Sequence, residues 1–378
     1  MRRILVLLLG LVLAGCSSTS PDDFAADLGV PLKVTTAVGS LEIPWDVKPL
    51  PGGRLLITER DRARVLLWRA GHRRVLGGFP TSKVWVSGEA GLMSLAVDPR
   101  FGSNRRVYTC QAWNLAGGGH DVRVIAWRLD PTYRRLVLQK VLVDGLPTVT
   151  GRHSGCRLLI VKSGALMVGT GDAAVGTNPQ DLTSLGGKTL RLNRLTGAPW
   201  PGNPFIGAAN HDQRYVFTYG HRNVQGLAQR ADGTVWSVEH GPDVDDEVNR
   251  LVAGGNYGWN PVPGYNETVP MTDQSLPGPQ VEARWSSGDP TLATSGATWV
   301  RGQQWGDLNG TLAVACLKAS RLLFIKFDAA GHLMWVRQPS ALQQFGRLRS
   351  VTNAPNGDLL VTTSNGADDR VLRVHPLG

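Results

Sequence analysis

The sequence has few cysteines, few lysines and little sign of amphipathic helices. Only four of its 378 residues are cysteine, and only eight of its 40 basic residues are lysine. Its 46 glycines and 23 prolines make up nearly one residue in five, against a usual combined share of about 12%. A long helical bundle and a coiled coil are therefore excluded, and many short strands joined by tight turns are favoured.

The chain also lacks any run of four or more basic residues, although its formal net charge is +10. A protein that binds nucleic acid usually concentrates its positive charge in a patch or stripe. Because the arginines are scattered along this chain, nucleic-acid binding is not expected.

No apolar segment at the N-terminus is long enough to span a bilayer. Arg2 and Arg3 precede an apolar run of about ten residues, 4–13, whereas a membrane-spanning helix needs about twenty. This pattern predicts a signal peptide. Its end, Leu13-Ala14-Gly15-Cys16, resembles the bacterial lipobox, in which a lipid is attached to the cysteine after cleavage. The alternative is an ordinary secretory signal with an accidental cysteine.

The N-terminal pattern divides the chain into three parts. We expect a lipoprotein signal peptide at 1–15, the lipidated Cys16 with a flexible tether at 16–30, and a folded body at 31–378. The protein is then held at the cell membrane by its lipid and works on the extracytoplasmic face.

Three cysteines remain in the folded body: Cys110, Cys156 and Cys316. An odd number leaves at least one free thiol or an intermolecular pair. Their spacing matches no zinc motif. A disulfide between Cys110 and Cys156 is possible, but buried unreactive thiols are the more frequent outcome.

A turn followed by an alternating apolar strand recurs six times in the body. The copies begin at residues 53, 104, 164, 233, 310 and 357. Such a period with insertions is typical of propeller blades, in which four strands repeat about every 40–50 residues. The sequence therefore predicts an all-β fold, a six-bladed β-propeller of four-stranded antiparallel blades over 31–378. Seven or eight blades remain structural alternatives.

No P-loop, nucleophile elbow or zinc-protease signature is present. In a propeller the chemistry is expected in loops near the central channel. The polar segments out of step with strand alternation are Gly88–Leu92, Arg152–Gly155, Gly169–Asp172, Gly220–Gly226, Glu239–Glu247, Gly254–Trp259, Lys318 and Arg347–Arg349. Each of them alone has an ordinary surface or turn explanation.

Together these segments resemble the pyrroloquinoline-quinone (PQQ)-dependent glucose/sorbosone dehydrogenase family, which includes soluble aldose sugar dehydrogenases. The most specific matches are Gly-His-Arg-Asn-Val-Gln-Gly at 220–226, the acidic run at 239–249, and Gly-Asn-Tyr-Gly-Trp at 255–259. The resemblance extends from Pro44 to Arg349. It implies a six-bladed propeller and a quinone-dependent oxidation of a sugar or related alcohol.

The resemblance implies three catalytic roles. His153 corresponds to the general base that takes the proton from the substrate hydroxyl as hydride leaves the same carbon. Asp172 corresponds to the carboxylate that orients this imidazole and raises its basicity. Arg222 corresponds to the cation that stabilises negative charge on the reacting oxygens.

The resemblance also implies two cofactors, PQQ and Ca²⁺. The three carboxylates of the quinone call for fixed cations and donors, which correspond here to Arg222, Asn223, Thr291, Lys318, Arg347 and Arg349. The carbonyls of Gly241 and Pro242 correspond to ligands of the calcium ion that touches the quinone. Asp246, Glu247 and Tyr257 correspond to a second, structural calcium site near the dimer contact of some relatives, so a homodimer is possible.

Three positions that face the substrate differ from the pattern of the glucose enzyme. Arg152 stands in place of an aspartate, Asp289 in place of an aromatic residue, and Glu89 in place of an amide. Arg152 suits an acidic or phosphorylated sugar, unless it simply points to solvent.

We therefore expect a membrane-anchored quinoprotein dehydrogenase with a sugar or alcohol substrate and an external electron acceptor. The rival interpretation is a non-catalytic envelope propeller that binds a glycan or a protein partner. A calcium-dependent lactonase-type propeller is a more distant alternative, because it needs no clamp for a tricarboxylate.

Overall fold

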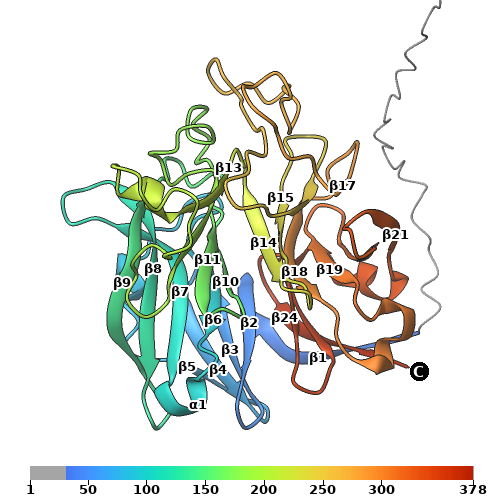
Figure 1. Cartoon of the computed structure of the whole chain (residues 1–378). Helices are drawn as coiled ribbons and strands as arrows, with labels where there is room; N and C mark the ends of the chain where they lie inside the picture. Colours follow the sequence, from blue (N-terminus) through green and yellow to red (C-terminus); the bar gives the residue numbers. More distant parts are fainter. Residues whose placement is uncertain (1–30, 378) are drawn as a thin grey trace, which may run out of the picture.

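Six four-stranded antiparallel sheets form the part of the chain that the structure describes, residues 31–377 of a computed structural model. The predicted signal peptide, the Cys16 lipidation site and the tether lie outside the described residues. Within residues 31–377 no helix combines the length and the apolar character that crossing a bilayer requires. Figure 1 shows the sheets as the blades of a propeller, with the segment 251–284, coloured yellow to orange, rising at the top.

The strands of each blade follow one another from the channel outward. The first blade has β2 (Pro44–Leu50), β3 (Arg54–Glu59), β4 (Arg64–Arg69) and β5 (His72–Val75), and the second has β6 (Leu92–Val97), β7 (Arg106–Asn114), β8 (His120–Leu129) and β9 (Leu136–Leu146). The third has β10 (Arg157–Ile160), β11 (Ala165–Gly169), β12 (Lys188–Asn193) and β13 (Val216–Tyr219), and the fourth has β14 (Val224–Gln229), β15 (Val235–Glu239), β16 (Glu247–Arg250) and β17 (Trp285–Ser286). The fifth has β18 (Thr294–Trp299), β19 (Leu312–Cys316), β20 (Arg321–Phe327) and β21 (Leu333–Arg337), and the sixth has β22 (Leu348–Asn353), β23 (Leu359–Thr363), β24 (Asp369–Pro376) and β1 (Leu32–Leu41). Short helical turns connect some strands: α1 (Phe101–Asn104), η2 (Thr81–Lys83), η3 (Asp212–Tyr215), η4 (Gln303–Leu308) and η5 (Ser340–Phe345).

The six recurring sequence phrases are the second strands of the six blades, β3, β7, β11, β15, β19 and β23. In five copies the glycine that opens the phrase has a positive φ, between 70° and 94°. This is the left-handed conformation that a tight hairpin turn requires and that glycine adopts without strain. One turn and one strand per blade explain the period, and the six-bladed prediction is confirmed.

The ring is closed by a strand from the far end of the chain. β1 pairs with β24 in antiparallel register, from Leu32 opposite Pro376 to Leu41 opposite Asp369. The last blade is therefore built from both ends of the described chain, which leaves no open seam between the first and sixth blades. The repeat pattern did not predict this pairing, because β1 precedes the first copy of the phrase.

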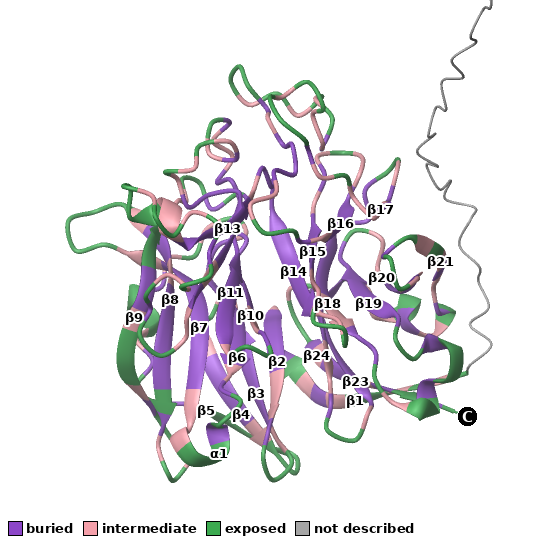
Figure 2. Ribbon diagram, viewed as in Figure 1, coloured by how far each residue is buried: buried purple, intermediate pink, exposed green. Residues whose placement is uncertain are grey.

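The hydrophobic core is divided into six clusters, one between each pair of neighbouring blades. Figure 2 shows the consequence, because the strands are mostly buried while exposed residues gather in the connecting loops and on outer strands. Alternating apolar residues on both faces of each sheet allow this packing. The inner strands surround the central channel, and polar residues at their ends face it.

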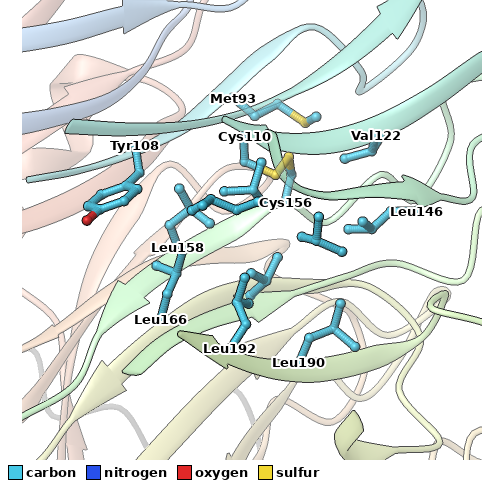
Figure 3. Packing of buried hydrophobic residues seen from close by; sticks show 14 of the residues in the cluster. Met93, Tyr108, Cys110, Val122, Leu146, Cys156, Leu158, Leu166, Leu190 and Leu192 are labelled. Carbon is cyan, nitrogen blue, oxygen red and sulfur yellow. A yellow bond between two sulfur atoms is a disulfide. The ribbon is translucent and has the colours of Figure 1, made fainter. Parts of the chain in front are cut away.

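A disulfide joins Cys110, on β7 of the second blade, to Cys156, which lies just before β10 of the third. Figure 3 shows it inside the apolar cluster between these blades. Of the two outcomes that the sequence left open, the disulfide is the one present, and not the more frequent one of two unreactive thiols. Spacing alone could not reveal the pair, because the packing of two blades brings together residues 46 positions apart. Cys316 is buried and free.

Candidate active site

The site residues are brought together by the direction of the inner strands. β2, β6, β10, β14, β18 and β22 contact one another in a closed ring around the channel. Each of these six is the innermost strand of its blade, whereas β1 is the outermost strand of the sixth blade. The six inner strands therefore all start at the same end of the channel. Predicted site residues lie just before or at these starts: Glu89 before β6, Arg152 and His153 before β10, Arg222 and Asn223 before β14, Thr291 before β18, and Arg347 and Arg349 at β22. We call this end the active end.

His153 and Asp172 form a buried pair at the active end. The Nδ1 atom of His153 lies 2.8 Å from Oδ1 of Asp172, and both side chains are almost fully buried. The other oxygen of Asp172 accepts hydrogen bonds from Trp259 Nε1 at 2.8 Å and from the Tyr265 hydroxyl at 2.7 Å. These contacts fix the orientation of the Asp172 carboxylate against the ring of His153. With Nδ1–H bonded to Asp172, Nε2 is the atom of His153 left to act as a base.

Two glycines allow the chain to fold tightly around this pair. His153 itself has a φ of 52°, which is unusual for a residue with a side chain. A Cβ atom on Gly171 would lie 1.9 Å from the carbonyl oxygen of His153, and one on Gly155 would lie 2.3 Å from the Gly171 nitrogen. Any other residue at these two positions would push the His153 loop away from Asp172.

The loop between β16 and β17 supplies residues that the sequence did not identify. The Tyr265 hydroxyl also lies 2.9 Å from His153 Nδ1. Burial and the nearby charge of Asp172 raise the pKa of Tyr265, so it remains a hydroxyl donor. Two residues further on, Glu267 binds Arg152 with both oxygens at 2.6 Å and also accepts a hydrogen bond from Arg222. The side chain of Arg152 is half exposed and paired, so it neither points freely to solvent nor offers an unpaired charge.

Arg222 is fixed from three directions. Its backbone N–H donates to Glu239 at 2.8 Å, and its Nη1 donates to the His240 carbonyl at 3.2 Å. Its guanidinium lies 5.6 Å from the centre of the Trp259 ring. The side chain is 96% buried with Glu267 as its counter-ion, which makes it a fixed cation in a site with little water.

A hydrogen-bonded chain connects the blades around the channel. Asn223 donates to Glu89 at 3.0 Å and accepts from the Gly155 N–H and from Gln225, each at 3.1 Å. Gln225 in turn accepts from Arg349 at 3.1 Å. Burial opposes ionisation of Glu89, but the charges of His153 and Arg349 and the bond from Asn223 outweigh it and lower the pKa of Glu89. The predicted substrate residue Glu89 is therefore a carboxylate beside the predicted cofactor residues.

Several arginines lie close enough to one another at the active end to interact as like charges. Burial and the like charges of Arg60, Arg157 and Arg347 lower the pKa of Arg349 to about 9, with Glu89 as the opposing charge. Among the described residues, Nε of Arg349, Nε of Arg222 and Nε2 of His240 are buried without a hydrogen-bond partner. Buried donors without partners are costly. An acidic ligand such as a tricarboxylate quinone fits these atoms, because it supplies both the missing acceptors and the missing charge.

The remaining predicted cofactor and substrate residues lie at the rim. Lys318 Nζ lies 3.3 Å from Thr291 Oγ1, so these two predicted residues meet. Lys318, Arg347 and Asp289 are exposed, whereas Thr291 is buried. The contacts that surround the His153–Asp172 pair do not include Asp289, and its substrate role stays a prediction.

The predicted calcium ligands separate into two groups. Asp246 accepts hydrogen bonds from the N–H groups of Gly241, Leu292 and Thr294, so its side chain ties two loops together. Gly241 is buried in this turn, with Pro242 next to it. The carbonyls of Gly241 and Pro242 remain predicted ligands of the calcium near the quinone.

Glu247 and Tyr257 are engaged elsewhere. Burial, with the charge of Glu239, raises the pKa of Glu247, which accepts a hydrogen bond from Asn249. The Tyr257 hydroxyl donates to the Arg250 carbonyl, and its ring stacks on His221. Residues 31–377 contain no group of three or more His, Cys, Asp or Glu side chains that could hold a metal ion. The structural calcium site at Asp246, Glu247 and Tyr257 stays a prediction.

A sequence model described as Glucose / Sorbosone dehydrogenase matches residues 41–373, nearly the whole described chain. The chain belongs to this family. It is 27% identical over 352 residues to the aldose sugar dehydrogenase YliI of Escherichia coli K12, covering 89% of this chain and 91% of that protein.

Two solved structures are also similar. One is a putative oxidoreductase (glucose dehydrogenase) from Thermus thermophilus, at 37% identity and a TM-score of 0.77, covering 91% of this chain and all of that one. The other is the PQQ-bound aldose sugar dehydrogenase of Streptomyces coelicolor, at 30% identity and a TM-score of 0.77, covering 93% of this chain and all of that one.

Proposed function

We propose that the protein is a PQQ-dependent dehydrogenase that oxidises a sugar, most directly an aldose, at the active end of the propeller. The observation that carries the proposal is the buried His153–Asp172 pair beside the buried arginines Arg222 and Arg349, whose Nε donors have no partner within residues 31–377. A base and an acidic-ligand site at one end of one channel are what this oxidation needs. The family relationship supports it, because relatives are aldose sugar and glucose dehydrogenases.

When bound, the quinone supplies the acceptor for the two electrons of the sugar C–H bond. His153 Nε2 takes the proton of the hydroxyl on the same carbon, which becomes a carbonyl. Asp172 stabilises the imidazolium that forms and keeps Nδ1 protonated. Arg222 stabilises negative charge on the oxygens, and Tyr265 with Trp259 hold Asp172 in place.

The quinone carboxylates would be held by Arg349, Lys318 and Arg347, with Asn223 and Thr291 as donors. Calcium would be held by the carbonyls of Gly241 and Pro242 and would polarise the acceptor.

A non-catalytic propeller that binds a glycan or a protein partner has no need for this arrangement. A binding surface does not require a histidine buried against a carboxylate at a φ of 52°. It also does not require buried arginine nitrogens left without partners, as Arg222 and Arg349 have within residues 31–377. Both features impose a cost that a redox site explains and a passive surface does not.

We further propose that the chain is a lipoprotein anchored through Cys16 and that it works outside the cytoplasm, where it passes electrons to an external acceptor. The Cys110–Cys156 disulfide supports this location, because disulfides persist in oxidising compartments. Incorporation of labelled fatty acid into the wild-type chain but not into Cys16→Ala tests the anchor. Label that remains in the variant would contradict it.

The test of the activity is a titration of the purified full-length protein with PQQ in the presence of Ca²⁺, followed by dye reduction with a panel of aldoses. We expect saturable binding at micromolar quinone or below and sugar-dependent dye reduction. A Lys318→Ala variant should bind the quinone more weakly, while Lys326→Ala, with the same charge change on β20, should not. No binding at micromolar quinone would overturn the proposal.

A further inference from the structure

The opposite end of the channel contains a cavity that none of the predicted site residues lines. Its volume is about 730 Å³. It is lined mostly by the second halves of the inner strands, including Lys48 on β2, Ala96 on β6, Leu227 on β14 and Val351 on β22, and by the whole of β10 from Arg157 onward. Because these strands start at the active end, the cavity lies at the other end, which we call the far end. Small-molecule sites commonly have volumes of roughly 300–1,000 Å³.

The lining of this cavity carries charge of one sign. Its charged residues are Lys48, Arg100, Arg157, Lys162, Arg194 and Arg301, and no aspartate or glutamate of the described chain lines it. Two buried carboxylates behind the wall offset part of this charge. Asp46 pairs with Lys48 at 2.8 Å and with Arg157 at 3.1 Å, and Asp98 pairs with Arg194 at 3.0 Å. Six cations against two carboxylates leave a clear positive excess. In a concave site the electric field of these charges is focused, which strengthens their attraction for an anion.

Arg157 shows that the protein alone does not satisfy this charge. Its side chain is 96% buried, and its guanidinium lies 4.1 Å from the centre of the Trp45 ring. Nε donates to the Gln225 carbonyl and Nη1 to Asp46, but within residues 31–377 Nη2 has no partner. Burial lowers the pKa of Arg157, and the nearby charge of Asp46 opposes this shift only in part. A buried guanidinium with a free donor on the wall of a basic cavity calls for an acceptor in that cavity.

The cavity also has neutral groups suited to an organic molecule. Thr298, Thr352 and Gln229 supply polar side chains, while Val97 and Trp299 supply apolar wall. Thr352 already accepts a hydrogen bond from Lys48 at 3.0 Å, which fixes the ammonium at the cavity wall. A single inorganic ion would occupy only a small part of 730 Å³.

We propose that the far-end cavity binds a small organic polyanion, a molecule with two or more carboxylate or phosphate groups. Arg157 and Lys48 would bind one acidic group at the inner wall. Arg100 and Arg301, both exposed at the rim, would bind another. The rim residues of this site are not among those of the sugar-oxidising site, although Arg157 at its inner wall also acts electrostatically on Arg349.

The test is isothermal titration calorimetry of the purified full-length protein with citrate and, in a second arm, with pyrophosphate, at low ionic strength. We expect one saturable site with a Kd at or below about 1 mM for at least one of the two. If citrate binds more tightly, the site prefers carboxylate groups, and if pyrophosphate binds more tightly, it prefers phosphate groups. The double variant Arg100→Ser/Arg301→Ser should bind at least roughly tenfold more weakly, since it loses two charge-assisted contacts.

The matched control is Arg74→Ser, which removes an exposed arginine from β5 outside the cavity. It should keep the wild-type affinity, and all variants should titrate PQQ as the wild type does. Absence of binding in both arms would overturn the proposal. So would equal weakening in Arg74→Ser, which would indicate a general charge effect, or displacement of the anion by PQQ, which would place it at the active end.

Discussion

Two His–Asp pairs lie at opposite ends of this propeller. His153 Nδ1 and Asp172 are 2.8 Å apart at the active end, and His375 Nδ1 and Asp358 are 2.7 Å apart near the turn after β22. The side chain of His153 is 4% exposed and that of His375 is 49% exposed. The bond alone therefore does not make a catalytic pair.

The surroundings of the two carboxylates make the difference. Asp358 also binds Arg373 at 2.9 Å and Asn356 at 2.7 Å, so its charge is balanced by a cation on its own sheet. Asp172 has Trp259 and Tyr265 instead, and its negative charge remains available to an imidazolium on His153. Burial, loop geometry and an available charge separate the proposed base from a surface ion pair.

The largest expected effect comes from exchanging one carboxylate in each pair. Asp172→Asn removes the charge that stabilises the His153 imidazolium, so turnover in dye reduction should fall by about 10²–10⁴-fold, the range of a general-base contribution. Quinone affinity should stay within a few-fold. Asp358→Asn is the matched control and should keep wild-type turnover per folded protein. Equal losses in both variants would mean that the two pairs do not differ as described.

A disulfide tethers the loop of His153. Cys156 lies three residues after His153, and its bond to Cys110 joins positions 46 residues apart. Replacing both cysteines by serine should lower the free energy of unfolding by about 2–4 kcal/mol, measured by denaturant titration. Dithiothreitol should destabilise the wild type and leave the double variant unchanged. The Cys316→Ala variant should be destabilised by dithiothreitol as the wild type is. A Cys316→Ala variant that is insensitive to dithiothreitol would contradict the assignment of the Cys110–Cys156 pair.

The positive charge at the active end offers a third test. Arg349→Lys keeps a cation but loses the planar donors, so PQQ affinity should fall by roughly ten- to a hundredfold. Arg301→Lys at the far end should leave PQQ affinity unchanged. An absorbance titration measures both. If the far-end variant were the weaker binder, the quinone would lie at the opposite end of the channel from His153, which would contradict its proposed place.

The smallest expected effect concerns substrate choice. Glu267 pairs with both Arg152 and Arg222 and offsets one of their two positive charges, so the site attracts an acidic sugar less than two unpaired arginines would. Glu267→Gln should lower KM for a uronic acid by roughly three- to tenfold and change KM for a neutral aldose less. Glu282→Gln, an exposed glutamate of the same segment, is the control. An unchanged ratio of the two KM values would contradict the assigned role of Glu267.

The fold was predictable from sequence because each blade repeats the same local signals. A glycine turn and an alternating strand recur at Gly164 and Gly233 as at three other copies, while Asn104 opens the sixth, and these signals need no distant contact. The pairing of β1 with β24 escaped prediction because it joins residues more than 300 positions apart. The Cys110–Cys156 disulfide could be named only as a possibility, because the packing of two blades, and not the local sequence, brings the two cysteines together.

The site was predictable only in part. His153 and Arg222 lie just before inner strands and Asp172 lies just after β11, and all three belong to motifs of the family, so sequence identified them. Tyr265 and Glu267 lie in a long connection with no periodic pattern, and only the fold shows that it reaches Asp172 and Arg152. Arg152 is less suited to an acidic sugar than predicted, because Glu267 pairs with it. The sequence did not indicate this pairing, because the two residues are 115 positions apart.

The central claim is that His153 is the base of a quinone-dependent sugar oxidation. The most direct measurement is the single-turnover reduction of bound PQQ by an aldose, followed by the absorbance of the quinone, in the wild type, His153→Ala and His375→Ala. We expect full quinone binding in all three, a reduction rate lowered by about 10²–10⁴-fold in His153→Ala, and a wild-type rate in His375→Ala. A His153→Ala protein that binds the quinone and reduces it at the wild-type rate would contradict the claim.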